Sequence, residues 1–545
     1  MKKTVSIILS LLLAIAVVPS AFGSSLSIYD GYPREGYYIY TVYDSKATIW
    51  SVDKSISGDV TIPSTLGGSP VSTITAKAFN DCKSLTGITI PEGVTTIYGS
   101  AFENCTNLKT VNIPDSVITV GNNAFNNTAW YNNQPDGLVY AGKIAYKYKG
   151  DCPKTVKIKD GTRSIASYAF QNCSELASVI IPNSVTNIDK MAFFGCISLT
   201  DITMSDGIEI IDSLAFDDTA WYNSQPDGLV YLGKAAYKYK GACPEIVEIK
   251  EGTVAISSNA FEGCAELKKV VIPSSVKNIG DSAFAECKLL NDVNIPEGVT
   301  YIGEYAFYLC RALETIVIPD SVTEIGEYLF RASSSLKNVT LPKNLKIINA
   351  GIFAGCESLE SIVIPEEVTD IDYRAFQGCT NLDNVIVPDS CTYIGVQAFQ
   401  SCEKLTNISF SKNLKSIKES AFDECKNLKT VYYAGDESDK ENINIEYYND
   451  KLLNAQWYYN ACIGSAEHNY DEKGKCTVCK NTLYVLGDVD GNDAVNTTDL
   501  AVLKLFLAGT SGLDETGLLA GDLNDDSKVN TTDLAQIKLM LAGVE

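Results

Sequence analysis

The chain has 545 residues, 45% of them hydrophobic, and a formal net charge of −23. This acidic balance argues against nucleic acids and anionic membrane surfaces as partners. No stretch after the N-terminal region approaches the roughly 20 apolar residues of a transmembrane helix, so we expect no membrane span.

Residues 1 to 23 have the three parts of a secretory signal peptide. Basic Lys2 and Lys3 precede an apolar run over residues 5 to 18, and Ala21-Phe22-Gly23 supplies small residues for cleavage after Gly23. Removal of the segment would change the net charge from −23 to about −25. We therefore expect a secreted, extracellular mature protein.

The middle of the chain, residues 66 to 432, is built on a 23-residue repeat. Fourteen of the 18 phenylalanines keep this period: Phe79, Phe102, Phe125, Phe170, Phe193, Phe216, Phe261, Phe284, Phe307, Phe330, Phe353, Phe376, Phe399 and Phe422. A short fixed period predicts a solenoid, in which each unit buries its apolar side only against its neighbours.

The spacing within one unit assigns physical roles. Leu85, Ile88 and Ile90 alternate on one face of a short strand, which the next proline ends because it cannot donate to a continuing ladder. Stacked strands predict a mainly β solenoid with one long parallel sheet. Ala101 and the ring of Phe102 form the opposite wall, with the rings in a stacked column. The pattern resembles the BspA-type leucine-rich repeat of bacterial surface proteins.

Two units are 45 residues long and belong to a larger duplication. Residues 79 to 169 recur as residues 170 to 260, a repeat of 91 residues. In each copy a turn dipeptide, Asp136-Gly137 or Asp227-Gly228, lies between strand-like residues and predicts a hairpin.

Trp130 and Trp221 occupy equivalent positions in these two units. They are either exposed rings that stack on sugars or rings that seal the local core. The general burial of tryptophan favours sealing.

The two ends of a solenoid must be covered. We expect an N-terminal cap over residues 24 to 65 and a C-terminal cap over residues 433 to 461. In the second cap, Leu452, Leu453 and Trp457 are expected to cover the last coil.

The cysteine pattern argues against a disulfide framework. Eleven of the 17 cysteines stand three residues after a repeat phenylalanine: Cys82, Cys105, Cys173, Cys196, Cys264, Cys287, Cys310, Cys356, Cys379, Cys402 and Cys425. Equivalent positions elsewhere hold Thr128, Thr219 and Ser333. A position that accepts Cys, Thr or Ser needs a small, weakly polar side chain, so we expect a buried column of free thiols.

One face of the predicted sheet points outward. One column of this face holds Thr89, Asn112, Ile180, Thr203, Val271, Asn294, Val317, Thr340, Val363 and Ile386, and the other holds Thr110, Ser178, Asp201, Lys269, Asp292 and Thr315. The surface is weakly polar and has almost none of the aromatic rings of carbohydrate platforms. It suits a protein partner, although β-branched residues favour strands whether or not they bind anything.

Cysteine and histidine cluster between residues 462 and 485. Cys476-x-x-Cys479 has the knuckle spacing of a zinc site, and Cys462 with His468, the only histidine, would complete a Cys3His tetrahedron. The alternatives are a disulfide of Cys476 with Cys479 or Cys462, and a plain linker.

Residues 486 to 545 contain a loop-and-helix unit twice, 34 residues apart. At positions 1, 3, 5, 7, 9 and 12 the first loop has Asp488, Asp490, Asn492, Ala494, Asn496 and Asp499, and the second has Asp522, Asn524, Asp526, Lys528, Asn530 and Asp533. Five side-chain oxygens and the carbonyl of position 7 in each loop predict two bound Ca²⁺ ions.

Each loop leads into a helix, expected over residues 497 to 508 and 531 to 542 and ended by a glycine. The apolar stripes of these helices are Leu500, Leu503 and Leu507, and Leu534, Ile537 and Leu541. Aspartate at position 12 and the lack of glycine at position 6 depart from the ordinary EF-hand. The segment resembles the dockerin domain of cellulosomes, which attaches a secreted component to a cohesin module of a scaffold protein in a calcium-dependent way.

The resemblance also implies which residues bind the cohesin. They are the two residues before the last calcium ligand and two further along the helix: Thr497, Thr498, Lys504 and Leu505, and Thr531, Thr532, Lys538 and Leu539. Because both copies present the same side chains, either helix is expected to meet the same cohesin surface. Attachment to a scaffold would keep the protein at a cell surface.

No familiar catalytic constellation is recognisable, since the chain has one histidine and neither a glycine-flanked nucleophile elbow nor a phosphate-binding glycine loop. We expect a non-catalytic cellulosome-type component whose solenoid binds a protein or a cell or plant-wall surface. The alternatives are a polysaccharide-degrading enzyme, whose carboxylate pair the sequence does not exclude, and a host-surface adhesin.

Overall fold

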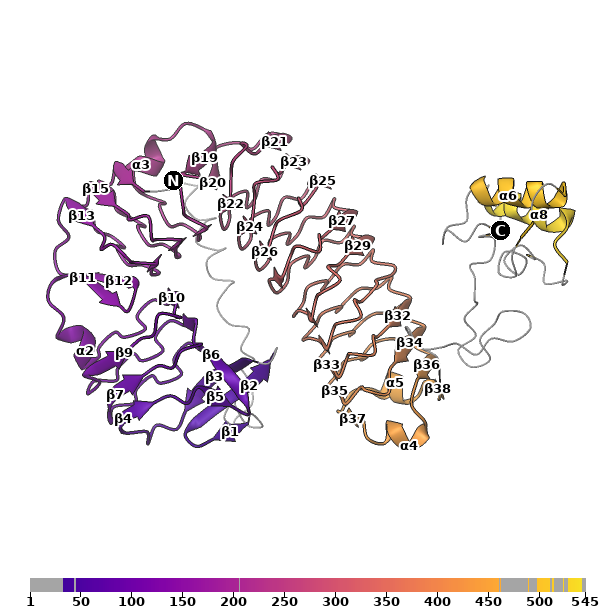
Figure 1. Cartoon of the computed structure of the whole chain (residues 1–545), viewed down its shortest axis with the longest axis horizontal. Helices are drawn as coiled ribbons and strands as arrows, with labels where there is room; N and C mark the ends of the chain where they lie inside the picture. Colours follow the sequence, from indigo (N-terminus) through magenta and orange to yellow (C-terminus); the bar gives the residue numbers. More distant parts are fainter. Residues whose placement is uncertain are drawn as a thin grey trace. The chain divides into compact units, whose positions relative to one another are not determined.

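The computed structural model describes residues 33–43, 46–204, 206–459, 461, 489, 497–509, 512–513, 523 and 528–541. The chain divides into two compact units: unit 1 comprises residues 1–117 and 123–133, and unit 2 comprises residues 118–122 and 134–545. In both units the regular structure is mostly short β-strands, contributed by successive coils (Figure 1). None of the helices in the described ranges is long and apolar enough to cross a membrane.

Unit 1 begins with an antiparallel meander. Strands β1 (Arg34–Glu35), β2 (Tyr38–Tyr43) and β3 (Lys46–Val52) pair antiparallel, and β3 then pairs in parallel with β6 (Ser69–Ile74). The ring of Tyr38 packs edge-on against Phe79 at 6.4 Å. The meander therefore closes the first coil. The other elements of unit 1 are β4 (Gly58–Thr61), β5 (Thr65–Leu66), β7 (Leu85–Thr89), β8 (Thr96–Ile97), β9 (Thr110–Asn112) and helix α2 (Ala129–Asn132).

Most coils contribute two strands. Strands that precede the repeat proline, or the equivalent position where a coil has another residue, form ladder 1, which in unit 1 is β4-β7-β9. In unit 2, ladder 1 consists of β13 (Thr155–Lys157), β15 (Ser178–Ile180), β17 (Asp201–Thr203), β21 (Ile246–Glu248), β23 (Lys269–Val271), β25 (Asp292–Val293), β27 (Thr315–Val317), β29 (Asn338–Thr340), β32 (Asn384–Ile386), β34 (Asn407–Phe410), β36 (Thr430–Tyr433) and β38 (Gln456–Tyr458). The predicted parallel stacking of these strands is confirmed.

A second set of strands, ladder 2, lies just before the Ala-Phe pair of each coil. In unit 2 its members are β10 (Thr119–Val120), β14 (Ser164–Ile165), β16 (Asn187–Ile188), β18 (Ile210–Ile211), β22 (Ala255–Ile256), β24 (Asn278–Ile279), β26 (Tyr301–Ile302), β28 (Glu324–Ile325), β30 (Ile347–Ile348), β31 (Asp370–Ile371), β33 (Tyr393–Ile394), β35 (Ser416–Ile417) and β37 (Asn444–Ile445). The sequence did not predict ladder 2, because a two-residue strand is too short to show alternation.

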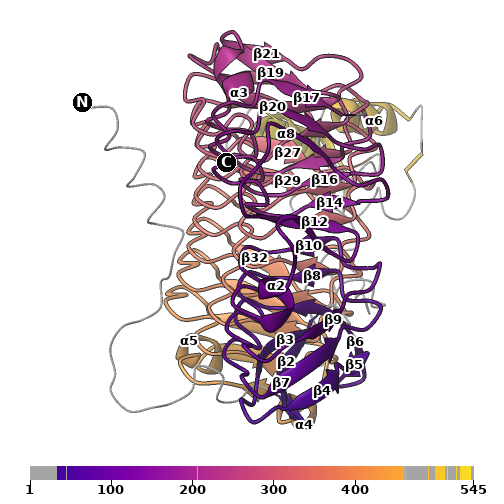
Figure 2. The same ribbon diagram turned by 90° about the vertical axis from the view of Figure 1, so that its left-hand side faces the viewer.

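Two hairpins in unit 2 start new parallel sheets. They are β11 (Gly137–Ala141) with β12 (Ile144–Lys149), and β19 (Gly228–Leu232) with β20 (Ala235–Lys240). The second strand of each continues in parallel, as β12-β14-β16-β18 and β20-β22-β24-β26-β28. Figure 2 shows β12, β14 and β16 one above the other. Ladder 1 is divided at the same places and again after β25 and β29, and ladder 2 is divided again after β28, so neither ladder is one uninterrupted sheet.

The hairpins are confirmed, but their predicted turns are wrong. The turns are Gly142-Lys143 and Gly233-Lys234, whereas Asp136 lies just before strand β11. Gly142 and Gly233 have φ of 62° and 58°. Glycine adopts this left-handed conformation without the steric cost of a side chain, which explains why the chain reverses there.

The phenylalanine column is confirmed within each unit. Ring centroids of successive coils lie between 4.7 Å, for Phe79 with Phe102, and 5.8 Å, for Phe307 with Phe330, and the rings are stacked. These side chains are completely buried.

The column of free thiols is confirmed, and ten of its eleven predicted members are buried, whereas Cys173 is half-buried. Cys105 donates its Sγ–H to the carbonyl of Phe79 at 3.0 Å, in the preceding coil. At the equivalent position of another coil, the Ser333 hydroxyl donates to the Phe307 carbonyl at 2.8 Å. The position therefore requires a small donor that links one coil to the next.

Thr128 and Thr219 have a different role at this position. The Thr128 hydroxyl donates to the Phe125 carbonyl within its own coil at 2.8 Å and accepts from the Tyr131 N–H at 3.1 Å. It is thus the N-cap of α2, and Thr219 caps α3 (Ala220–Ser224) in the same way. A side-chain oxygen at this place satisfies a free N–H of the first helical turn.

The solenoid ends with helices α4 (Glu437–Lys440) and α5 (Asp450–Leu453) and strand β38. Leu452 is buried, and the indole of Trp457 packs above it, donating to the Leu452 carbonyl at 3.1 Å. The prediction that Leu453 covers the last coil is wrong, because this residue is exposed. Consecutive helical residues point about 100° apart, so only one of the two leucines can face the coil.

Candidate functional site

The outward face of ladder 1 is the most extended candidate surface. Its predicted columns are open to solvent, and Val317, Val363 and Ile386 are 57%, 84% and 50% exposed. Between residues 293 and 363 the face forms an open groove of about 380 Å³. Apolar side chains grouped on an open surface are a feature of protein-binding sites.

Polar groups on this face are paired between neighbouring coils. Lys269 donates to Asp292 at 2.7 Å, and Ser178 donates to Asp201 at 3.0 Å. Exposed pairs of this kind contribute little to stability. They do reduce the unpaired charge of the face, which therefore remains weakly polar as predicted.

A tyrosine cluster that the sequence analysis missed lies after ladder 2. The rings of Tyr305 and Tyr328 stack with centroids 4.9 Å apart, and Tyr308 meets Tyr305 edge-on at 5.7 Å. All three are half-buried. The available signal was the recurrence of Gly-Glu-Tyr at residues 303–305 and 326–328. On the face of ladder 1 a comparable pair lies at the end of the solenoid, where Tyr432 of β36 stacks on Tyr458 of β38 at 5.6 Å.

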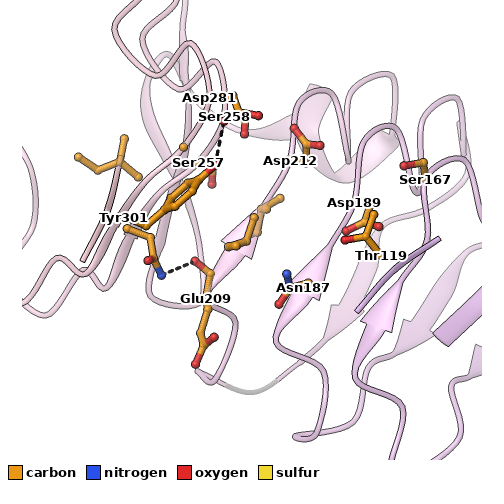
Figure 3. Close-up of a pocket in the computed structure, with 15 residues that line it drawn as sticks. Thr119, Ser167, Asn187, Asp189, Glu209, Asp212, Ser257, Ser258, Asp281 and Tyr301 are labelled. Atoms are coloured by element: carbon orange, nitrogen blue, oxygen red, sulfur yellow. Dashed lines mark hydrogen bonds between the residues drawn. The ribbon is translucent and has the colours of Figure 1, made fainter. Parts of the chain in front are cut away.

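A small acidic cleft lies in unit 2 where one sheet of ladder 2 ends and the next begins. It encloses about 160 Å³ and is lined from β16 and β18 on one side and from β22, β24 and β26 on the other (Figure 3). Asp189, Glu209, Asp212 and Asp281 contribute carboxyl groups, and the Tyr301 hydroxyl donates to Asp281 at 3.1 Å.

Burial changes the acidity of these groups. Asp189 is only 7% exposed, and its Oδ2 has no hydrogen-bond partner. Burial and the nearby charge of Asp212 raise the pKa of Asp189 well above its usual range, and the Ser164 hydroxyl opposes this effect. The same two causes raise the pKa of Asp281. Burial and the charge of Asp281 raise the pKa of Glu304 to about 7.

The cleft does not have the arrangement of a polysaccharide hydrolase. Such an enzyme needs two carboxyl groups on either side of a sugar, both within reach of a polymer chain. Asp189 is almost completely buried, and the cavity is small. Among the described residues, no group of three or more His, Cys, Asp or Glu has a metal-binding arrangement.

Trp130 and Trp221 each close one stack of the phenylalanine column. Trp130 lies edge-on to Phe125 at 5.1 Å, and Trp221 lies edge-on to Phe216 at 5.8 Å. Both are half-buried. These contacts support the interpretation that the indoles seal the local core.

The C-terminal segment contains helices α6 (Thr497–Leu507) and α8 (Thr531–Leu541), of 11 residues each, which pack side by side (Figure 1). Val489, Leu503 and Ile537 form their buried core. Three other residues of the predicted apolar stripes pack against this core: Leu500, Leu507 and Leu534. In the described part of this segment the core is thus very small, which favours stabilisation by bound metal.

The second predicted calcium loop is partly described. The carboxylate of Asp533 is fully buried and accepts the backbone N–H of Leu523 at 3.0 Å and of Asn530 at 2.8 Å. These bonds tie the start of the loop to its end. They hold a carboxylate at the position where a hard, oxygen-seeking cation needs one, so the described donors fit Ca²⁺.

The remaining predicted site residues are described only in part. Of the cohesin set, Lys504, Leu505, Thr531 and Lys538 are exposed on the two helices. The side chains of Thr497, Thr498, Asp499, Thr532, Leu539 and Leu541 lie outside the described set. So do the signal peptide and residues Cys462, His468, Cys476, Cys479, Asp488, Asp490, Asn492, Ala494, Asn496, Asp522, Asn524 and Asp526. Their assignments stay predictions.

Solved structures of bacterial leucine-rich repeat proteins resemble the chain. A leucine-rich repeat protein from Bacteroides ovatus is 23% identical over 77% of this chain and 97% of its own, with a TM-score of 0.33. A leucine-rich cell surface protein from Faecalibacterium prausnitzii is 25% identical over 76% and 97%, with a TM-score of 0.28. No curated protein sequence matches.

Two family models match the chain. The BspA type leucine rich repeat region matches residues 59–136, 140–239, 222–337, 254–381 and 323–444. The dockerin type I domain matches residues 486–542. Neither model describes a catalytic domain. The chain belongs to the BspA-type leucine-rich repeat family and carries a dockerin type I domain after its repeats.

Proposed function

We propose that this protein is a secreted, non-catalytic adaptor of a cellulosome-type assembly, in which the dockerin binds a cohesin and the solenoid binds a second partner. The proposal is supported by the combination of a dockerin with a repeat solenoid whose long face is open. A signal peptide over residues 1 to 23 would direct export and be cleaved after Gly23, and the N-terminal sequence of the secreted protein tests this.

The dockerin would hold two Ca²⁺ ions in the loops that end at Asp499 and Asp533. Its cohesin contacts would be the threonine pairs and the Lys-Leu pairs of α6 and α8. Support comes from the buried Asp533 carboxylate and from the exposure of Lys504, Leu505 and Lys538. Since both helices carry the same pairs, we propose that either one can engage a cohesin.

Capture of the full chain by immobilised type I cohesins tests this proposal. Capture is expected in calcium and should be lost in chelator. Charge reversal at Lys504 and Lys538 together should abolish capture, whereas either reversal alone should leave it, and Lys451→Glu on α5 is the control. Capture that persists in chelator would contradict the proposal.

For the solenoid we propose a protein ligand on the outward face of ladder 1. The exposed column that includes Val317 and Val363 supports this choice. A specific observation also favours a second candidate, a plant-wall polysaccharide, because Tyr305 and Tyr328 offer stacked rings.

Binding of the full chain to arrayed plant polysaccharides and cell-surface proteins separates the two candidates. A protein ligand predicts loss with Val317→Asp and Val363→Asp, and retention with Tyr305→Ala and Tyr328→Ala. A polysaccharide ligand predicts the reverse pattern. If the valine double variant and the tyrosine double variant both bind as well as the wild-type protein, neither surface is the binding site.

For Cys462, His468, Cys476 and Cys479 we propose one zinc ion, with a disulfide as the alternative. The spacing of the last two cysteines supports zinc. Metal analysis of the purified chain should find about one zinc per molecule, lost in Cys476→Ser. A zinc-free protein with a disulfide in this segment would contradict the zinc site.

A further inference from the structure

Two cysteines stand outside the buried column and recur with the 91-residue duplication. They are Cys152, just after hairpin strand β12, and Cys243, just after β20. Both are half-buried, free thiols. Because Cys152 and Cys243 recur at equivalent places of the duplication, we infer that they have the same structural environment.

Backbone hydrogen bonds bring Cys152 beside Cys173. The N–H of Tyr148 donates to the Ala169 carbonyl at 2.8 Å, and the N–H of Ala177, further along the second segment, donates to the Lys154 carbonyl of the first at 2.8 Å. The two segments between these bonds run alongside each other. Cys152 and Cys173 lie opposite each other within them.

The second copy repeats this arrangement. The N–H of Tyr239 donates to the Ala260 carbonyl at 2.7 Å, and the N–H of Lys268 donates to the Glu245 carbonyl at 2.7 Å. Cys243 therefore lies opposite Cys264, which is 7% exposed.

The two thiols of each pair interact directly. In the first pair the hydrogen bond from Cys173 lowers the pKa of Cys152, against the effect of burial. The same hydrogen bond, together with burial, raises the pKa of Cys173. Cys243 and Cys264 show the same two shifts from the same causes. Each pair thus combines a more acidic thiol with a less acidic partner, and in the second pair the more acidic thiol is also the more accessible.

Most other thiols of the column have a different partner. Cys82 and Cys105 of unit 1 also share a thiol–thiol hydrogen bond, but both are completely buried, and Cys105 donates to the Phe79 carbonyl at 3.0 Å. Cys196 donates to the Phe170 carbonyl at 3.0 Å, and Cys287 donates to the Phe261 carbonyl at 3.2 Å. Both are completely buried. Cys173 and Cys264 follow a hairpin instead of a normal coil, so no repeat phenylalanine lies 26 residues before them. Cys152 and Cys243 take the place of that phenylalanine as the neighbours of Cys173 and Cys264.

We propose that Cys152 with Cys173 and Cys243 with Cys264 are two paired thiol sites, each of which closes to an intramolecular disulfide by exchange with a small-molecule disulfide. The other thiols of the column stay reduced, since they are completely buried.

The exchange has two balanced steps. The Cys152 thiolate attacks one sulfur of the small-molecule disulfide, whose S–S bond breaks and releases one thiolate. The Cys173 sulfur then loses its proton and attacks Cys152 Sγ, which releases the second thiolate. Two protein S–H bonds become one S–S bond, the small disulfide is reduced to two thiols, and the two protons go to those thiols.

The bond would secure an exposed edge of the solenoid. Strand β13 starts three residues after Cys152 and is the edge strand of the sheet β13-β15-β17; β21 has the same place in β21-β23-β25. A disulfide would fix each edge strand to the following coil, next to the break that the hairpin introduces.

Oxidised glutathione tests the proposal on the native full chain. After exposure, remaining thiols are alkylated in denaturant, and unreduced peptides are mapped by mass spectrometry. We expect a loss of four alkylatable thiols from the solenoid, with cross-links 152–173 and 243–264 and with Cys196 and Cys287 still alkylated. Dithiothreitol should restore all four.

Variants separate pairing from general reactivity. Cys152→Ser with Cys243→Ser should form neither cross-link, while the matched pair Cys196→Ser with Cys287→Ser should form both. The cross-linked peptides found in the wild-type protein test the proposal even if a variant fails to fold. Glutathione retained on Cys152 or Cys243, cross-links to other column cysteines, or complete alkylation of the four residues would each overturn the proposal.

Discussion

At the scale of single residues, two interior columns hold the coils together by different means. The phenylalanine rings stack and contribute buried apolar area, whereas the thiols donate hydrogen bonds to carbonyl groups of the preceding coil. Both columns were predictable because a fixed period places every copy in the same environment. A substitution in either column therefore tests the packing directly.

Loss of one ring should open a cavity that neighbouring coils cannot fill. We expect Phe284→Ala to lower the free energy of unfolding of the solenoid by about 3–5 kcal/mol, measured by denaturant unfolding. Val363→Ala, at a side chain that is mostly exposed, should change it by less than about 0.5 kcal/mol. Similar effects of the two substitutions would contradict the buried column.

The thiol column can be tested with a pair of near-isosteric changes. Cys310 donates to the Phe284 carbonyl at 3.3 Å. Cys310→Ser retains a donor, as Ser333 does naturally, and should be nearly neutral. Cys310→Val removes the donor and should cost about 0.5–1.5 kcal/mol. Equal stability of the two variants would show that the hydrogen bond is unimportant.

The buried acid of the cleft predicts a pH dependence of stability. Because burial and Asp212 raise the pKa of Asp189, the folded protein binds this proton to higher pH than the unfolded chain does. The stability contributed by the neutral carboxyl is present below about pH 4 and is lost as the pH rises through the raised folded pKa.

Asp189→Asn cannot ionise and should therefore reduce the fall of Tm between about pH 4 and pH 8. Thermal unfolding across this range measures the effect. Asp160→Asn, at an exposed position, should keep the wild-type slope. The same slope in all three proteins would show that Asp189 ionises freely.

The cleft and the tyrosine cluster were beyond the sequence analysis for the same reason. Asp189 and Asp281 belong to different coils on either side of a sheet break, and only the folded chain brings them to one cavity. The tyrosines occupy a variable position of the repeat, where most coils have other residues. The repeat period identifies only the residues that recur in every coil, and the residues of the cleft and of the tyrosine cluster do not.

At the scale of elements, the sequence predicted each hairpin but placed its turn incorrectly. Asp136-Gly137 has the composition of a two-residue turn, yet Gly137 begins β11, and the chain reverses at Gly142. Ladder 2 was missed because its strands have two residues. In contrast, helices α6 and α8 agree with prediction to within a residue, since their loops, apolar stripes and terminal glycines all indicated the same boundaries.

Calcium removal should unfold the dockerin and leave the solenoid folded. The core of α6 and α8 in the described residues is small, and the buried Asp533 carboxylate closes the second proposed calcium loop. Limited proteolysis of the full chain should cleave residues 486–545 about ten-fold faster in chelator than in calcium. Asp533→Ala should be cleaved rapidly even in calcium, whereas Asp160→Asn should behave as wild type. Equal cleavage rates with and without calcium would contradict this expectation.

At the scale of the whole molecule, the proposed adaptor combines two binding regions in one chain. The repeats provide a long, open face, and the dockerin type I domain, which we propose binds a cohesin, follows them. An adaptor of this kind must bind through its solenoid and through its dockerin at the same time. Independent binding by either end alone would not establish its function.

The most direct test is therefore a bridging measurement. A fluorescent type I cohesin is mixed with insoluble plant cell walls or with bacterial cells, with and without the full chain, and sedimented. We predict that the cohesin sediments only when the protein and calcium are both present, and that chelator releases it. Cohesin that remains in solution with every surface, although it binds the protein in calcium, would contradict the adaptor function.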